Sequence, residues 1–187
     1  MALIDIISDR VQTIIDSRTN VFIKEVQKEL LDQGHVNTGK LRDSIRKEVE
    51  RFPGLIRVTV FMLEYGFAID KGIKPDRIPY SGFSGSGGTS DYIQGLQDYF
   101  ITKGLSTDNA LSAAFATANK HKQEGMPTKA SFRFSNNGKR TGFFSDPLQK
   151  LRRELEVLNS EIASQITLSV REVFKRHQGE FEKLVVL

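Results

Sequence analysis

The chain has 187 residues, of which 39% are hydrophobic and 27% are charged, and its formal net charge is +4. This composition is typical of an ordinary globular domain with a substantial core, and it does not indicate wholesale disorder. The chain contains no cysteine, which excludes disulfides, thiolate metal sites and cysteine nucleophiles.

Residues 3 to about 33 are predicted to form one long helix, because apolar residues recur there at steps of three and four. Gly34 follows at a position where a helix can end in the left-handed conformation. Such a helix is about 45 Å long, more than a domain of this size needs for its own core. Two interpretations remain open: a core helix with a frayed first turn, or a helix whose first turns pack on a neighbouring subunit through Leu3, Ile6 and Ile7.

A β-hairpin is predicted next, with its turn at Phe52-Pro53-Gly54. Its second strand alternates with period two, which is typical of a half-buried strand. The apolar face carries Ile56, Val58, Val60 and Met62, and the other face carries Arg57, Thr59, Phe61 and Leu63. We expect Val60 to lie in the core.

Residues 73–90 lose all periodicity and are rich in Pro, Gly and Ser, so we expect a flexible loop. A glycine-rich phosphate loop is the alternative. It requires a Gly-Lys-Ser/Thr ending after a parallel strand, and neither is present here.

Two helices should follow as an αα-hairpin, the first capped by Asp91 and ended by Lys103-Gly104. Thr107 or Asp108 should cap the second, which runs to about Glu124. His121 lies at its charged end without a second ligand nearby, which indicates a solvated side chain. The other two histidines, His35 and His177, are equally isolated in the sequence.

Residues 125–145 contain no acidic side chain and are predicted to form a β-hairpin or a long extended loop with a basic tip. Four basic residues, Lys129, Arg133, Lys139 and Arg140, alternate with phenylalanines. Single-stranded nucleic acids are bound by such combinations of basic and aromatic residues. The alternative is that the phenylalanines pack inward and the basic residues face solvent or a neighbouring subunit.

A last long helix is predicted from Pro147, which suits a first helical turn. The apolar residues of this helix form a regular stripe, which is more often core than coiled coil. They are Leu148, Leu151, Leu155, Leu158, Ile162, Ile166, Val170, Val173 and Phe174. The final residues 184–187 are all apolar, and we expect them to be buried in the subunit or in an assembly.

No catalytic, cofactor-binding or metal-binding residues are predicted. A nucleophile elbow is missing, and the acidic residues are dispersed along helix surfaces. Glu64 and Asp70 flank the end of the hairpin and could serve as paired carboxylates of a hydrolase. The more economical interpretation is that Asp70 accepts hydrogen bonds or pairs with a basic residue nearby, so we expect no enzymatic activity.

The stretch Asn37–Gly72 carries a resemblance to a known family. Its TGKLRDSI turn, paired strands and final Tyr-small-x-x-Ile/Val-acid-x-Gly segment resemble the tail-completion (neck and minor tail component) family of tailed bacteriophages. Tyr65, Gly66, Ile69, Asp70 and Gly72 match that last element, with aspartate for the usual glutamate and Lys71 for the usual aromatic residue. The similarity covers residues 1–72, with a weaker echo over 110–187.

The resemblance implies a structural virion protein at the head–tail junction, assembled in the host cytoplasm as a six- or twelve-fold ring through which DNA passes. Its partners would be further copies and other neck, portal-side or tail proteins, with transient non-specific DNA contact and no membrane association. Lys129, Arg133, Lys139 and Arg140 are the candidate partner or lumen contacts. Two alternatives remain: a non-catalytic nucleic-acid-binding module using residues 129–144, and a hydrolase.

The predicted fold is α+β. A small antiparallel sheet packs on long N- and C-terminal helices, with a helical-hairpin insertion. We expect one domain over residues 1–187, with residues 1–72 and 125–187 as its core. Residues 73–124 supply the loop and the insertion.

Overall fold

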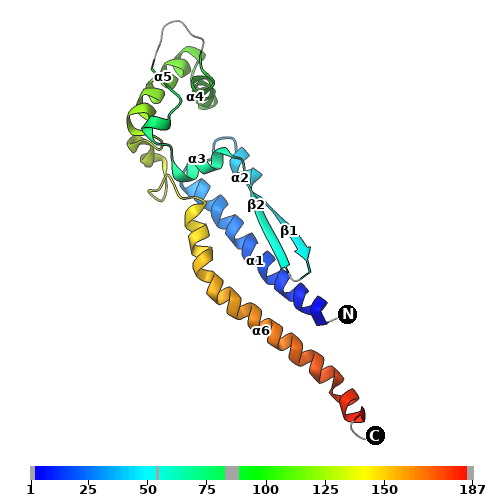
Figure 1. Cartoon of the computed structure of the whole chain (residues 1–187). Helices are drawn as coiled ribbons and strands as arrows, with labels where there is room; N and C mark the ends of the chain where they lie inside the picture. Colours follow the sequence, from blue (N-terminus) through cyan, green and yellow to red (C-terminus); the bar gives the residue numbers. More distant parts are fainter. Residues whose placement is uncertain (1–2, 54, 83–88, 185–187) are drawn as a thin grey trace. The chain divides into compact units, whose positions relative to one another are not determined.

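The computed structural model describes residues 3–53, 55–82 and 89–184, without the side chains of 3–8, 155, 156, 158, 173 and 176–184 (Figure 1). The described chain is mostly helical and contains a two-stranded antiparallel sheet, which confirms the predicted α+β class. The chain divides into two compact units. The hairpin unit comprises residues 1–28, 39–62 and 144–187, and the helical unit comprises 29–38 and 63–143. A single domain stays a prediction.

Helix α1, Leu3–Asp32, confirms the predicted first helix. It ends as the sequence indicates, with Gly34 at a φ of +68°. The N–H of His35 donates to the carbonyl of Leu30 (2.9 Å), and that of Gly34 donates to the carbonyl of Leu31 (3.0 Å), which is the Schellman pattern of helix termination. A side chain at Gly34 would overlap the carbonyl oxygen of Phe134, so glycine is needed here for space as well as for conformation.

In the hairpin unit, the short helix α2, Lys40–Ser44, leads into strands β1, Arg46–Phe52, and β2, Leu55–Phe61. The strands pair antiparallel from Phe52↔Leu55 to Arg46↔Phe61, which confirms the predicted hairpin and its alternation. Lys47 donates to the Asp16 carboxylate on α1, so the face with Val58 and Val60 is the one directed at the helix. Val60 is half-buried, less than the core position expected for it.

Helix α6, Ser145–Leu184, begins with Pro147 in its first turn, as predicted. In Figure 1, α1 lies between the hairpin and α6. Three ion pairs join the two helices in antiparallel order: Arg10–Glu172 (2.9 Å), Arg18–Glu161 (3.1 Å) and Glu25–Lys150.

The prediction that the whole α6 stripe is core is wrong for Ile166 and Phe174, whose exposed fractions are 37% and 65%. The physical reason is coverage. The pairs Arg10–Glu172 and Arg18–Glu161 place this part of α6 beside α1, and a single neighbouring helix covers only one side of it. The side chains of Leu155, Leu158 and Val173, and residues 185–187, lie outside the described part of the chain.

The helical unit contains α3, Tyr65–Lys71, the 3₁₀ turn η1, Pro75–Arg77, helices α4, Asp91–Thr102, and α5, Thr107–Glu124, and the 3₁₀ segment η2, Lys129–Phe134. Helices α4 and α5 pack together and confirm the predicted αα-hairpin. The caps lie one residue earlier than predicted, at Ser90 and Ser106. The Ser90 hydroxyl accepts from the N–H of Ile93 (3.4 Å). The core of this unit contains Ile78, Tyr80, Ile93, Ala114 and Ala118.

The flexible loop predicted over residues 73–90 is wrong for residues 73–80. Ile73 and Met126 exchange two backbone hydrogen bonds (2.7 and 2.8 Å). Ile78 and Tyr80 belong to the core of the helical unit. These apolar side chains supply the burial that a Gly/Ser composition lacks. Residues 83–88 of the predicted loop lie outside the described part.

The predicted hairpin or extended loop over residues 125–145 is also wrong, because its first half forms η2. The backbone of the second half bonds elsewhere: the N–H of Asn136 donates to the carbonyl of Asp32 (2.7 Å), and that of Gly142 donates to the carbonyl of Asp70 (2.8 Å). Since these groups are satisfied by the end of α1 and by α3, no cross-strand ladder is needed.

Candidate interaction surfaces

The outward face of the hairpin combines charged and aromatic side chains. The Arg46 guanidinium lies 4.7 Å from the centre of the Phe61 ring, and that of Arg57 lies 5.1 Å from the centre of the Phe52 ring. Arg57 also pairs with Glu50 across the strands at 3.5 Å. At the turn, Phe52 and Leu55 are 41% and 51% exposed. This face offers aromatic and arginine side chains, the residue types enriched in protein interfaces.

The two outer edges of the sheet differ in charge. Strand β1 carries five charged residues in seven, whereas β2 carries one, Arg57. Across the described residues, no backbone hydrogen bond joins either outer edge to another segment. An apolar, unpaired strand edge readily accepts another strand, and charges on an edge strand oppose this. The edge of β2 is therefore the more receptive one.

Helix α3 shows what the resemblance motif does in the structure. Gly66 and Asp70 are buried, and a side chain at Gly72 would meet the carbonyl oxygen of Met126, so these positions fix α3 in the helical unit. In contrast, Tyr65 and Phe67 are 49% and 54% exposed. The motif thus combines a buried framework with an exposed aromatic surface.

The four basic candidates of residues 129–140 do not all lie on the surface. Lys129, Arg133 and Lys139 are exposed, and the Arg133 guanidinium lies 4.7 Å from the centre of the Phe134 ring. The half-buried Arg140 donates through Nη1 to the carbonyl of Gln33 at the end of α1. Burial lowers the pKa of Arg140. Arg140 thus closes the end of a helix and is not displayed for a partner.

The phenylalanines of the same segment are divided in the same way. Phe143 is completely buried, whereas Phe132 and Phe134 are 42% and 61% exposed. The expectation that the phenylalanines pack inward is therefore confirmed for Phe143 and wrong for Phe132 and Phe134, and the expectation that the basic residues face outward is wrong for Arg140.

A polar cluster that is mostly half-buried lies around Arg140. The His35 ring contacts the carbonyl oxygen of Arg140 through Nε2 (3.0 Å), so Nε2 carries the proton and donates. Burial, and then the charge of Arg140, lower the pKa of His35 to about 4. Gln33 and Asn137 both donate to the Glu29 carboxylate, at 3.0 and 2.9 Å. This cluster holds the loop before Phe143 against the end of α1.

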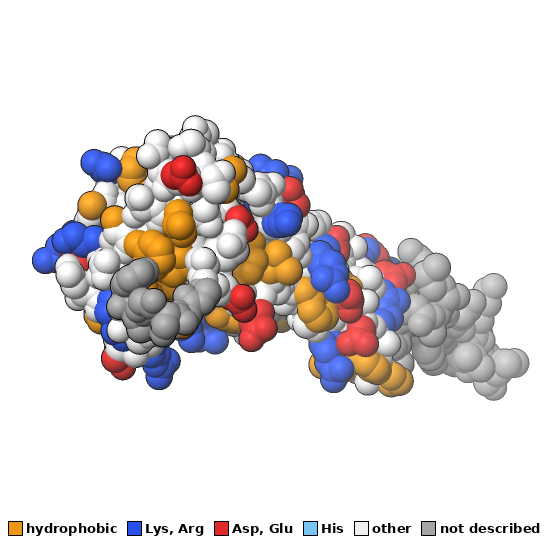
Figure 2. All heavy atoms as spheres, turned by 90° about the horizontal axis from the view of Figure 1, so that it is seen from above, with side chains coloured by type: hydrophobic (Ala, Val, Ile, Leu, Met, Phe, Trp, Pro, Cys, Tyr) orange, Lys and Arg blue, Asp and Glu red, His pale blue; other side chains and the backbone are white. Residues whose placement is uncertain are grey.

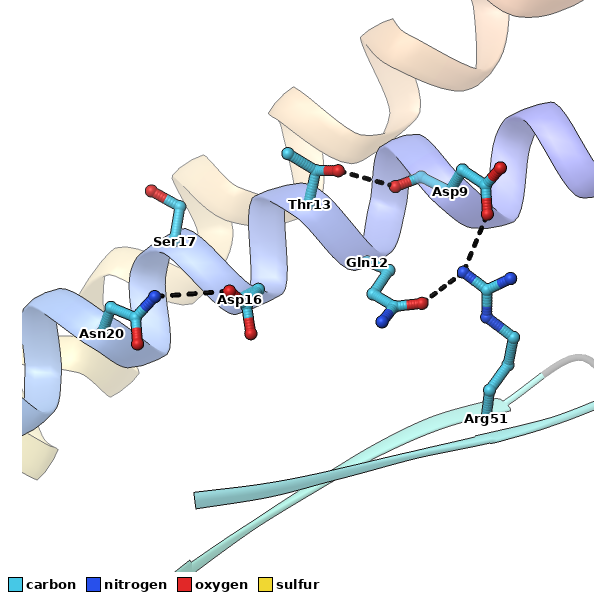
Figure 3. Close-up of a pocket in the computed structure, with 7 residues that line it drawn as sticks. All are labelled: Asp9, Gln12, Thr13, Asp16, Ser17, Asn20 and Arg51. Atoms are coloured by element: carbon cyan, nitrogen blue, oxygen red, sulfur yellow. Dashed lines mark hydrogen bonds and ion pairs between the residues drawn. The ribbon is translucent and has the colours of Figure 1, made fainter. Parts of the chain in front are cut away.

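An open polar groove of about 630 Å³ runs along α1 beside β1 (Figure 3). Its charged groups are engaged with one another, since Arg51 donates to Asp9 (2.9 Å) and to Gln12, and Lys47 pairs with Asp16. The groove is lined by Asp9, Gln12, Thr13, Asp16, Ser17, Asn20 and Arg51. With its carboxylates already neutralised, it offers no unpaired charge for a ligand.

The remaining sequence candidates are placed as follows. Glu64 is exposed before α3 and Asp70 is buried within it, about 9 Å further along the helix axis, so the two are not brought together as paired carboxylates. The side chains of Leu3, Ile6, Ile7 and His177 lie outside the described residues. The prediction of a solvated His121 is wrong: its half-buried ring contacts the Tyr92 hydroxyl at 2.6 Å.

Burial explains the titration of that pair, because it lowers the pKa of His121 and raises the pKa of Tyr92 to about 12. Among the described residues, no three His, Asp or Glu side chains are grouped as a metal site would require. Within the same residues, no helix combines the length and the apolar character needed to span a membrane.

Sequence analysis missed the strand edges and the exposed side chains of α3, although the unequal charge of β1 and β2 was a readable signal. Figure 2 shows hydrophobic side chains in separate patches on one face, with basic and acidic side chains between them. No family model matches the chain, and no curated protein or solved structure matches it either.

Proposed function

We propose that this chain is a structural subunit of a ring at the head–tail junction of a tailed bacteriophage. Copies of the chain would assemble with one another and with neck, portal-side or tail proteins, and DNA would pass through the ring. In such a cyclic assembly, one surface of each subunit contacts a different surface of the next. The proposal rests on the resemblance of residues 37–72 to the tail-completion family.

One observation supports it most directly. Within the segment that carries the resemblance, several large apolar side chains are exposed, while Gly66 and Asp70 of the motif are buried. Phe52, Leu55, Leu63, Tyr65 and Phe67 are each at least 39% exposed. Exposed apolar groups that recur within one short segment favour an interaction role over a purely internal one.

A nucleic-acid-binding module is the second candidate, favoured by the stacking of Arg133 on Phe134 and by the exposed Lys129 and Phe132. The buried positions of Arg140 and Phe143 reduce the groups that it could use. We therefore expect weak DNA binding without sequence preference, which a salt titration of duplex and single-stranded DNA would measure.

For duplex DNA, the slope of log affinity against log salt is about −0.9 for each phosphate contact. We expect Lys129→Glu/Arg133→Glu to abolish this weak binding and to leave assembly intact. Tight, sequence-selective binding at physiological salt, lost in this variant, would favour the module instead.

Assembly itself is tested by light scattering and native mass spectrometry of the protein, alone and mixed with neck or tail proteins. We expect higher-order oligomers, which Tyr65→Lys/Phe67→Lys should weaken. The matched control is Ser112→Lys/Ala116→Lys, which adds the same charges at exposed positions of α5. A protein that stays monomeric in all these mixtures would contradict the proposal.

A further inference from the structure

We propose that copies of this chain join through their hairpins: the outer edge of β2 in one copy pairs antiparallel with the outer edge of β1 in the next. The sheet would then continue from subunit to subunit. This inference rests on the proposed ring for its cyclic closure, and it names the surfaces that form the joint.

The hairpin register determines which backbone groups are available. Strands joined by a two-residue turn exchange hydrogen bonds at the pair that flanks the turn, here Phe52 and Leu55, and then at every second pair. The intervening residues direct their N–H and C=O groups outward. On β2 these are Ile56, Val58 and Val60, and on β1 they are Lys47, Val49 and Arg51.

The outward backbone groups of β2 can pair with those of β1 in the next copy in the same register that joins β1 and β2 within one copy. If Val58 is placed opposite Val49 of the next copy, Ile56 lies opposite its Arg51 and Val60 opposite its Lys47. The outward groups of both strands then meet in hydrogen-bonded pairs, as an antiparallel ladder requires. The register between copies thus repeats the register within each copy.

Charge complementarity favours this partner. Arg57, which pairs with Glu50 of its own chain, would have Glu50 of the next copy on its other side. Phe61, stacked under Arg46 of its own chain, would likewise meet a second Arg46. Directly opposed cross-strand pairs of this kind stabilise a sheet, and like charges directly opposite destabilise it.

Symmetric pairing of two β1 edges is disfavoured for the same reason. Centred on Val49, it would place Glu48 opposite Glu50 and Lys47 opposite Arg51, so like charges would meet in four positions. The charges of β1 therefore oppose self-pairing and accept β2. A joint between two different edges is also the type that can continue round a ring.

The spacing of the joint suits the helix beneath the sheet. Two strands per copy give a repeat of about 9.6 Å. Packed helices lie about 8–10 Å apart. One α1 per copy can therefore follow the same repeat under the sheet, with each hairpin retaining its contacts to its own helix through Lys47 and Arg51.

Single-cysteine variants test the joint, because the natural chain contains no cysteine. In the proposed register, Thr59 lies opposite Glu48 of the next copy in a non-hydrogen-bonded pair, with Cα atoms about 4.5 Å apart. That separation lies within the disulfide range of about 4.4–6.8 Å. We expect a mixture of full-length Thr59→Cys and Glu48→Cys to form a covalent dimer on mild oxidation.

Neither variant alone should form this dimer, and nor should Glu48→Cys mixed with Ser112→Cys, whose cysteine lies on exposed α5. A covalent dimer from Thr59→Cys mixed with Arg57→Cys would indicate symmetric β2 pairing and would overturn the proposal. Oligomers without the Thr59–Glu48 bond would overturn the strand joint and leave the ring standing. A strict monomer would overturn both.

Hydrogen exchange of the natural chain gives a second test that needs no substitution. In assembled protein, the amides of Ile56, Val58 and Val60 should become protected. In dilute monomer they should exchange at least tenfold faster than those of Arg57 and Thr59, which the hairpin already protects. If the amides of Ile56, Val58 and Val60 exchange as fast in the assembly as in dilute monomer, the joint is excluded.

Discussion

The two helix pairs of this chain are held together by different means. In the helical unit, α4 and α5 contact along Ala110, Ala114 and Ala118, each completely buried, with Ile93 beside them. In the hairpin unit, α1 and α6 are joined by ion pairs between long side chains, including Arg10–Glu172. Val157 and Phe174 of α6 remain 62% and 65% exposed.

The difference follows from side-chain size at the contact. Alanine at every fourth position lies on one face of α5 and allows the backbones to approach closely, so that small apolar groups fill the space between them. Between α1 and α6, the arginine and glutamate side chains of the ion pairs are themselves partly exposed, and Val157 and Phe174 remain in contact with water. Both helix pairs therefore show apolar periodicity in the sequence, but the buried alanine contact belongs to α4 and α5.

The largest effect should come from a charge within the alanine contact. Ala114→Asp would bury a carboxylate with no cation beside it, and we expect a loss of about 3 kcal/mol or more in the free energy of unfolding of the helical unit. Urea denaturation followed by circular dichroism measures this. The control Ala116→Asp, exposed on the same helix, should change stability by less than about 0.5 kcal/mol. Equal losses would show that the contact is not close-packed.

The next effect tests the tightly packed end of the hairpin unit. Phe22 is 4% exposed and meets the Phe144 ring edge to face at 5.4 Å between ring centres. We expect Phe22→Ala to cost about 3 kcal/mol of stability, as for other buried aromatic residues. The control Phe174→Ala on exposed α6 should cost less than about 0.5 kcal/mol. A large loss at Phe174 would mean that α6 is buried along its length after all.

Local signals predicted the elements that depend on neighbouring residues. Gly34 indicated the end of α1, Pro53 the turn of the hairpin, and Gly104 the link between α4 and α5; each acts within a few residues of its position. The alternation of Val58 and Val60 also indicated which face of β2 would meet the helix. These features need no knowledge of distant partners.

Features that depend on distant residues could not be predicted in this way. The loop before Phe143 lacks cross-strand pairing because Asp32 and Gln33, about a hundred residues earlier, accept its hydrogen bonds. The same contact removes Arg140 from the candidate surface. Apolar periodicity cannot show how much of an apolar stripe a partner helix covers, which is why the exposure of Phe174 was missed.

A half-buried polar contact of the helical unit gives the third prediction. The pKa of His35 is lowered from an ordinary value of 6.5 to about 4, first by burial and then by Arg140. As pH falls from 6.5 to 4, the unfolded chain binds a proton that the folded chain does not, so stability should decrease by up to about 1.4 kcal/mol per pH unit. The partial burial of the ring makes the decrease smaller than this limit.

Urea denaturation between pH 7.5 and 4 measures how the free energy of unfolding changes with pH, for the natural chain and for His35→Gln. This variant keeps a side-chain donor for the carbonyl of Arg140. Below pH 6.5 we expect its free energy of unfolding to depend less steeply on pH than that of the natural chain, and above pH 6.5 we expect no difference in this dependence. His121, whose pKa is also lowered, should account for a further part of the pH dependence. Identical slopes in both proteins would show that His35 is solvated in the folded state.

The smallest effect concerns the ion pairs that join α1 and α6. Arg18 and Glu161 lie 3.1 Å apart, but their side chains are 43% and 41% exposed, so water and salt screen the pair. A double-mutant cycle with Arg18→Ala and Glu161→Ala should give a coupling of about 0.2–1 kcal/mol, reduced further in 1 M salt. Coupling well above 1 kcal/mol that persists in high salt would mean that the pair is desolvated, and that α1 and α6 pack as closely as α4 and α5.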